Sequence, residues 1–87
     1  MRIILTKEEL DANYYSTDDC AIARNLKKIL PGRSISVGGY SVSIDDSEYN
    51  MFTLNKSTLG FGIVDLKNMR SGVLEPIIEI VGLEELL

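Results

Sequence analysis

Apolar and hydroxyl residues alternate over residues 33–44 (RSISVGGYSVSI), on both sides of Gly38 and Gly39. Successive side chains of a strand point to opposite faces, so alternation around a diglycine turn predicts a β-hairpin. A two-residue turn would place Val37 opposite Tyr40. The side chains expected on the apolar face are Ile35, Val37, Tyr40, Val42 and Ile44, and those expected on the hydroxyl face are Ser34, Ser36, Ser41 and Ser43.

Two longer segments have the spacing of amphipathic helices, each with one apolar stripe to bury. The first, Thr17–Leu30, has Ser16 or Thr17 as its N-cap, acidic residues at its start, lysines near its end, and Pro31 as its stop. The second runs from about Thr58 to Arg70 and ends before Gly72. In the first helix, the side chains expected to face solvent are Arg24, Asn25, Lys27 and Lys28.

The N-terminal residues predict a strand followed by a short helical turn. Residues 3–5 (IIL) form an apolar run that suits a buried first strand. Thr6 and Glu9 have the spacing of a capping box, in which each side chain accepts a hydrogen bond from the other residue's backbone N–H. We therefore expect one helical turn over Lys7–Leu10.

The residues after the hairpin predict a loop and then a third strand. Residues 45–50 (DDSEYN) are acidic and prone to turns, which favours a solvated loop. Residues 51–54 (MFTL) resume the character of a strand, and we expect Phe52 and Leu54 to face inward.

The C-terminal residues complete the expected sheet. Proline is tolerated at the start of a strand, so Pro76 marks a last strand beginning near Ile77. The tail, residues 82–87 (GLEELL), either covers the sheet or contacts another copy of the chain. The whole order predicts an α+β fold, a mainly antiparallel sheet of about five strands with two helices packed on one face. The length suits a single domain over residues 1–87.

The composition lacks residues on which many catalytic mechanisms depend. The chain has no histidine and a single cysteine, Cys20, so it lacks the commonest general base, Ser-His and Cys-His pairs, the usual zinc ligand sets and any internal disulfide. Cys20 is most simply a small apolar residue in the packed stripe of its helix. Residues 60–62 (GFG) lack the full spacing of a phosphate-binding loop. We therefore expect no enzymatic activity, no cofactor and no bound metal.

The charge balance and the hydropathy constrain the partners and the location. Thirteen acidic and nine basic residues give a net charge of −4, which disfavours nucleic acid unless Arg24, Lys27 and Lys28 form a local basic patch. The acidic residues of 45–48 (DDSE) allow the opposite idea, in which the chain mimics DNA and competes for the DNA-binding site of a host protein. No apolar run approaches the roughly 20 residues of a membrane span, and the N-terminus does not resemble a signal peptide. The expected location is the cytoplasm.

Four segments together resemble a family of small uncharacterised bacteriophage and prophage proteins. The family carries an N-C-P-[IV]-A helix start, a V-x-V hairpin and a terminal E-P-[IF]-x-[FI] strand. Residues 20–23 (CAIA) match the helix start with Ala21 where proline is common, and residues 75–77 (EPI) match the last strand. The resemblance implies a bacterial host cytoplasm and no particular reaction. Its segments are residues 18–32, 35–44, 52–68 and 73–80.

These observations favour a non-enzymatic binding protein. In the context that the resemblance implies, it would counteract host defence by binding a host protein or by sequestering a small signalling molecule. The alternative is a structural or regulatory module that forms a homodimer through a strand edge or the tail. Serine hydroxyls both donate and accept hydrogen bonds, which suits a contact surface. The candidate binding residues are Arg33, Ser34, Ser36, Gly38, Gly39, Ser41 and Ser43.

Overall fold

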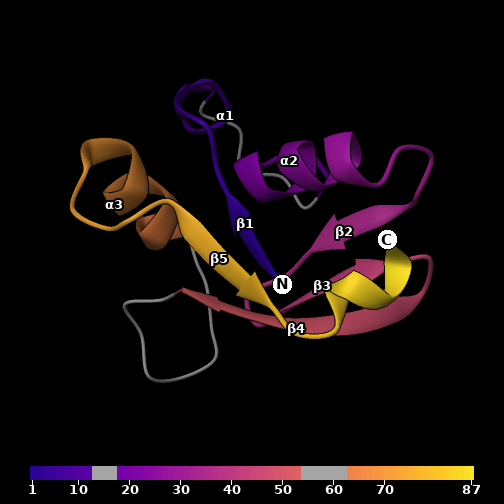
Figure 1. The fold of residues 1–87 in the computed structure, drawn as a ribbon. Helices are drawn as coiled ribbons and strands as arrows, with labels where there is room; N and C mark the ends of the chain where they lie inside the picture. The colour runs from indigo at the N-terminus through magenta and orange to yellow at the C-terminus, as the bar shows by residue number, and fades with distance from the viewer. Residues whose placement is uncertain (13–17, 54–62) are drawn as a thin grey trace.

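The computed structural model describes residues 1–12, 18–53 and 63–87 and has the predicted α+β architecture (Figure 1). A curled five-stranded sheet packs against three α-helices, and a short 3-10 helix ends the chain. The α-carbon radius of gyration is 11.7 Å. The strands are β1 (Arg2–Ile4), β2 (Ile35–Val37), β3 (Ser41–Ile44), β4 (Ser47–Thr53) and β5 (Ile77–Ile80). The helices are α1 (Lys7–Asp11), α2 (Ala21–Ile29), α3 (Ile63–Ser71) and η1 (Leu83–Leu86).

The sheet has the strand order β1-β5-β4-β3-β2, and every pair is antiparallel. Strands β2, β3 and β4 follow one another as hairpins, whereas β5 returns to lie between β1 and β4. The two edge strands are therefore β1 and β2. Both have contacts with α2: this helix packs against β2, and its Asn25 donates a hydrogen bond to the Ile4 carbonyl of β1.

The hairpin forms where the alternation predicts it, but the predicted pairing of its two strands is wrong. Val37 pairs with Val42 rather than with Tyr40. The residues that connect the two strands are Gly38, Gly39 and Tyr40, and the Gly38 N–H donates a hydrogen bond to the Ser41 carbonyl at 2.8 Å. Tyr40 is 69% exposed instead of belonging to the apolar face. The error is a shift of two residues, which leaves every other side chain on its predicted face because the side-chain period is also two.

Strand β4 begins four residues earlier than the sequence predicts. Asp45 and Asp46 have φ values of 50° and 70°, a left-handed conformation that aspartate tolerates, and they turn the chain directly into the new strand at Ser47. Pairing with β5 then places Met51 opposite Ile80 and Thr53 opposite Ile78 in the interior, and Phe52 lies on the other face. The expected inward position of Phe52 is thus wrong, and Leu54 lies outside the described residues.

Helix α1 confirms the predicted capping box. The Glu9 N–H donates to Thr6 Oγ1 at 3.1 Å, and the Thr6 N–H donates to Glu9 Oε1 at 2.8 Å. Helix α2 starts later than predicted, at Ala21, with Cys20 as an N-cap that makes no side-chain capping bond. The expected caps Ser16 and Thr17 lie outside the described residues.

Helix α3 ends as the sequence predicts, just before Gly72. This glycine has a φ of +86°, and the N–H groups of Val73 and Leu74 donate to the Asn68 carbonyl, which closes the helix. Leu66 and Met69 are its described core side chains. The first part of the predicted helix, with its two glycines, lies outside the described residues.

Part of the C-terminal tail packs on the core, whereas Leu87 at its end is exposed. Strand β5 begins at Ile77 as predicted, and Leu83 of η1 is fully buried. The Met1 ammonium donates to the Ile80 carbonyl at 2.7 Å and lies 2.9 Å from Glu84 Oε2, so β1, β5 and η1 are joined by polar contacts. Of the two roles expected for the tail, covering the sheet is confirmed. In the described part of the chain, no helix has the length and apolar character needed to cross a membrane.

Candidate functional site

The predicted hydroxyl face lies on the outer side of the β2–β3 hairpin. Ser34 and Ser36 are exposed, and Ser41 and Ser43 are half-buried. Ser36 pairs directly with Ser43 across the two strands, and Ser41 Oγ donates to Glu48 Oε1 on β4 at 3.1 Å. The opposite faces of the same strands are buried in the core, as the alternation predicts.

Arg33 and the diglycine lie at opposite ends of this hairpin. Arg33 Nη1 donates to Asp45 Oδ2 at 2.7 Å, and the Ser34 N–H donates to Asp45 Oδ1 at 3.0 Å. The bond from Arg33, together with the one from the Ser34 backbone, holds the pKa of Asp45 below its ordinary value. Gly38 and Gly39 begin the loop at the other end of β2, so the seven predicted residues form a strip along the hairpin rather than one compact cluster.

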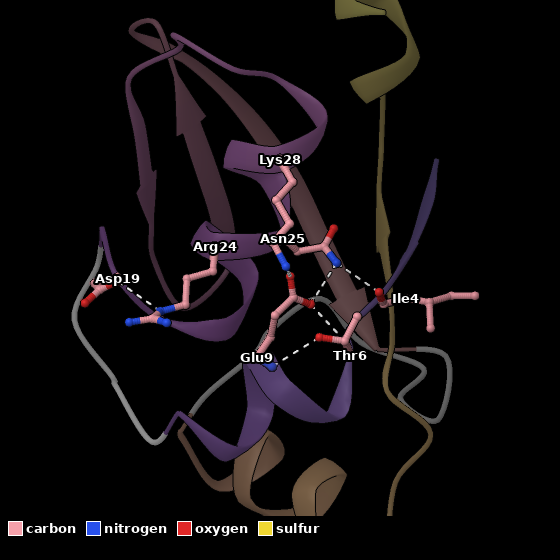
Figure 2. A network of polar contacts seen from close by, with 7 residues as sticks. All are labelled: Ile4, Thr6, Glu9, Asp19, Arg24, Asn25 and Lys28. Carbon is pink, nitrogen blue, oxygen red and sulfur yellow. Dashed lines mark hydrogen bonds and ion pairs between the residues drawn. The ribbon is translucent and has the colours of Figure 1, made fainter.

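A second group of polar side chains links α1, α2 and the edge strand β1 (Figure 2). Asn25 Nδ2 donates to Glu9 Oε1 at 3.0 Å and to the Ile4 carbonyl at 2.9 Å. Glu9 Oε1 also accepts the bond from the Thr6 N–H, and Glu9 Oε2 lies 3.2 Å from Lys28 Nζ. Thus a buried carboxylate holds the start of α1 to the middle and end of α2.

The Glu9 carboxylate is stabilised in its charged form although its side chain is only 3% exposed. Burial raises the pKa of Glu9, but the hydrogen bonds from Thr6, Asn25 and Lys28 outweigh burial and leave the pKa below its ordinary value. The Lys28 side chain is 64% exposed, so it covers an otherwise buried charge from the solvent side. Glu9 Oε1 accepts hydrogen bonds, whereas Glu9 Oε2 has no hydrogen-bond partner and is compensated by the nearby charge of Lys28.

The prediction that Asn25 faces solvent is wrong, and this residue is the centre of the network. Asn25 is buried because the β1 edge and α1 both pack on its side of α2. The sequence holds one signal for this position. Ala21 and Ile29 lie four residues before and after it, so Asn25 borders the apolar stripe rather than opposing it.

Two hollows lie between α1 and α2, beside this network. The smaller has a volume of about 240 Å³ and the larger about 590 Å³, and Glu8 and Arg24 line both. Arg24 is held by Asp19, whose Oδ1 lies 3.0 Å from its Nε (Figure 2). The other residues of the smaller hollow are Glu9, Lys27 and Lys28, and those of the larger are Lys7, Asp11 and Ala12.

The described residues offer little for metal or thiol chemistry. Over residues 1–12, 18–53 and 63–87, no three cysteine or acidic side chains are placed to hold a metal ion together. Cys20 is buried and belongs to the core, as the simplest interpretation of the sequence predicts. Within the described residues, the hydroxyl face and the α1–α2 hollows are two surfaces at which a partner or ligand could bind.

Comparison with known proteins adds no assignment. A scan against protein-family models, a search of curated proteins and a search of solved structures each found no match for this chain.

Proposed function

We propose that this chain is a non-enzymatic binding protein that engages a partner protein through the hydroxyl face. The observation that carries the proposal is the contrast between the two sides of the β2–β3 hairpin. Ile35 and Val37 are buried, while Ser34 and Ser36 on the same short segment are open to solvent. The hairpin is thereby fixed by its apolar side and presents its hydroxyls on a rigid support.

The geometry of this surface suits a macromolecule better than a small ligand. Side chains on one face of a strand lie about 7 Å apart, and sites for small molecules are usually concave rather than flat. Each serine both donates and accepts hydrogen bonds, so the face can pair with a partner's backbone or polar side chains. The exposed Tyr40 at the loop adds an aromatic contact of the kind enriched in interfaces.

The resemblance to phage proteins supports a bacterial host protein as the partner. A small protein made during infection can counteract a host defence by occupying a surface of the host protein, without any catalysis. This fits a chain that lacks histidine and has only one cysteine. Enzymatic turnover by the purified protein would contradict this part of the proposal.

Affinity capture from a bacterial lysate tests the proposed surface. We expect the wild-type protein to retain a specific partner, identified by mass spectrometry and then reconstituted from purified components. Ser36→Arg should abolish the binding, because a long charged side chain would stand on the middle of the face. Ser71→Arg, which changes an exposed serine at the end of α3, is the matched control. Equal binding by the Ser36→Arg and wild-type proteins would refute the proposal.

Self-association is the second candidate, and a different observation favours it. Ile4 is 66% exposed and stands opposite Ile77 on the outer side of the sheet, so two apolar side chains are adjacent there. A homodimer would cover them. Light scattering coupled to size-exclusion chromatography measures the mass directly, and Ile4→Lys should convert such a dimer to a monomer. A wild-type protein that is monomeric at all concentrations would exclude this candidate.

A further inference from the structure

The two edge strands of the sheet differ in how open they are to solvent. On β2, the Gly38 N–H donates to the Ser41 carbonyl of β3, and alternate residues of a strand face the same neighbour. The backbone groups that face away from β3 therefore belong to Ile35 and Val37. Ile35 is 5% and Val37 is 8% exposed, because α2 packs against this strand. The β2 edge is thus covered.

On β1, the hydrogen bonds place Arg2 and Ile4 on the open side of the strand. The Leu5 N–H donates to the Pro76 carbonyl at 2.8 Å, so Leu5 and Ile3 direct their backbone groups toward β5. The backbone groups of Arg2 and Ile4 therefore face away from β5. The Arg2 side chain is 68% exposed and Ile4 is 66% exposed, so solvent reaches this part of the edge.

The polar network between α1 and α2 occupies only one end of the β1 edge (Figure 2). Asn25 donates to the Ile4 carbonyl at 2.9 Å, and the Thr6 N–H, the next outward group, donates to Glu9. Three outward groups are left before this end: the Arg2 N–H, the Arg2 carbonyl and the Ile4 N–H. Among the described residues, none of these three groups has a hydrogen-bond partner. Such groups pair with the backbone of another extended segment.

We propose that the open edge of β1 pairs with β1 of a second copy of the chain, in antiparallel orientation. This contact rests on the self-association considered above as the second candidate, and it adds the strand edge through which the copies meet. A two-fold axis at Ile3 places Arg2 of each copy opposite Ile4 of the other. Each Ile4 N–H then donates to the Arg2 carbonyl of the other copy, and each Arg2 N–H donates to the second lone pair of the Ile4 carbonyl.

The side chains on the outer face favour this register. The aliphatic stem of Arg2 covers the exposed Ile4 of the other copy, while its guanidinium stays near Glu79, whose Oε2 lies 3.8 Å from Arg2 Nε. A shift that placed Arg2 opposite Arg2 would bring like charges together. Because β1 has only three residues, the contact is small, and we expect a weak dimer that forms as the concentration rises.

The mass and the amide exchange of the wild-type protein, measured at low and high protein concentration, test the proposal. Light scattering should show the mass rising from monomer to dimer. Hydrogen exchange followed by nuclear magnetic resonance should show the Ile4 amide becoming slower to exchange over the same range. The Ile3 amide, which is bonded within the sheet, is the internal control and should be protected at both concentrations.

Proline substitution separates the edge from the outer face. Ile4→Pro removes an N–H that faces away from β5, so it leaves the β1–β5 ladder intact and should weaken dimerisation by at least about tenfold. Ile4→Val keeps the N–H and should dimerise as the wild type does. Circular dichroism checks the fold, and if Ile4→Pro does not fold, Arg2→Pro removes the other outward donor. Ser36→Arg, on the hydroxyl face, should leave dimerisation unchanged.

Two outcomes would overturn the edge contact. A wild-type protein that stays monomeric at the highest concentration would exclude both this contact and self-association as a whole. If Ile4→Lys were monomeric while Ile4→Pro dimerised as strongly as the wild type, the copies would meet through the outer face of the sheet. Self-association would then stand, and pairing of the β1 edges would be refuted.

Discussion

The substitution Asn25→Ala tests whether the buried polar network stabilises the fold. It removes the hydrogen bond from Asn25 Nδ2 to the Glu9 carboxylate and the bond to the Ile4 carbonyl. A hydrogen bond to a charged group contributes about 1.5–3 kcal/mol, and one between neutral groups about 0.5–1.5 kcal/mol. We therefore expect the free energy of unfolding to fall by about 2–4 kcal/mol.

A loss of this size is large for a domain of 87 residues. Proteins of this length are stable by roughly 4–13 kcal/mol, and each lost kcal/mol lowers the midpoint of thermal unfolding by about 4–8 °C. Urea denaturation followed by circular dichroism measures the change, with the slope of the transition as a check that the folded state is still compact.

Asn50→Ala is the matched control. Asn50 lies on β4 with an exposed side chain, so the same substitution there should change the stability by no more than about 0.5 kcal/mol. If Asn25→Ala were also within about 0.5 kcal/mol of the wild type, the network would contribute no net stability and our account of α1 and α2 would be wrong.

Three further predictions concern pH, a helix end and the hairpin loop. Folding lowers the pKa of Glu9, so its contribution to the free energy of unfolding is fully present above the ordinary glutamate pKa of about 4.3 and is lost as the pH falls through the folded-state pKa. Glu9→Gln should therefore make the free energy of unfolding less dependent on pH, as measured by urea titrations between neutral and acidic pH. An unchanged pH dependence would contradict this prediction. Gly72→Ala should lower the free energy of unfolding by about 1–2 kcal/mol, measured by thermal unfolding, because Gly72 has a φ of +86°. The space around Gly72 is open, so only the backbone conformation opposes a methyl group. An unchanged stability would show that the helix end adjusts freely. Tyr40→Ser should change the stability by less than about 0.5 kcal/mol in urea unfolding, whereas the register with Tyr40 opposite Val37 would require a clear loss.

Local chemistry accounts for the features that the sequence predicts correctly. The Thr6–Glu9 capping box involves residues three positions apart, and the stop before Gly72 depends on one residue's backbone freedom. The alternation of serines and aliphatic residues assigns the faces of β2 and β3, because the two faces of a strand follow directly from the side-chain period. These predictions need no knowledge of what packs against the segment.

The register and the polar network depend on contacts between distant residues. Alternation is unchanged by a shift of two residues, so only the complete ladder through β4 fixes Val37 opposite Val42. Asn25 borders the apolar stripe of α2 in the sequence, and it is buried because β1 and α1, some 16 to 21 residues away, bring Ile4 and Glu9 to it. The sequence by itself predicted the order of the main strands and helices and the two faces of the hairpin, but not all of their bounds. The tertiary structure alone decided their register and gathered the charged side chains between α1 and α2, since hydrogen bonds and charges act over a few ångströms in space, however far apart the residues lie along the chain.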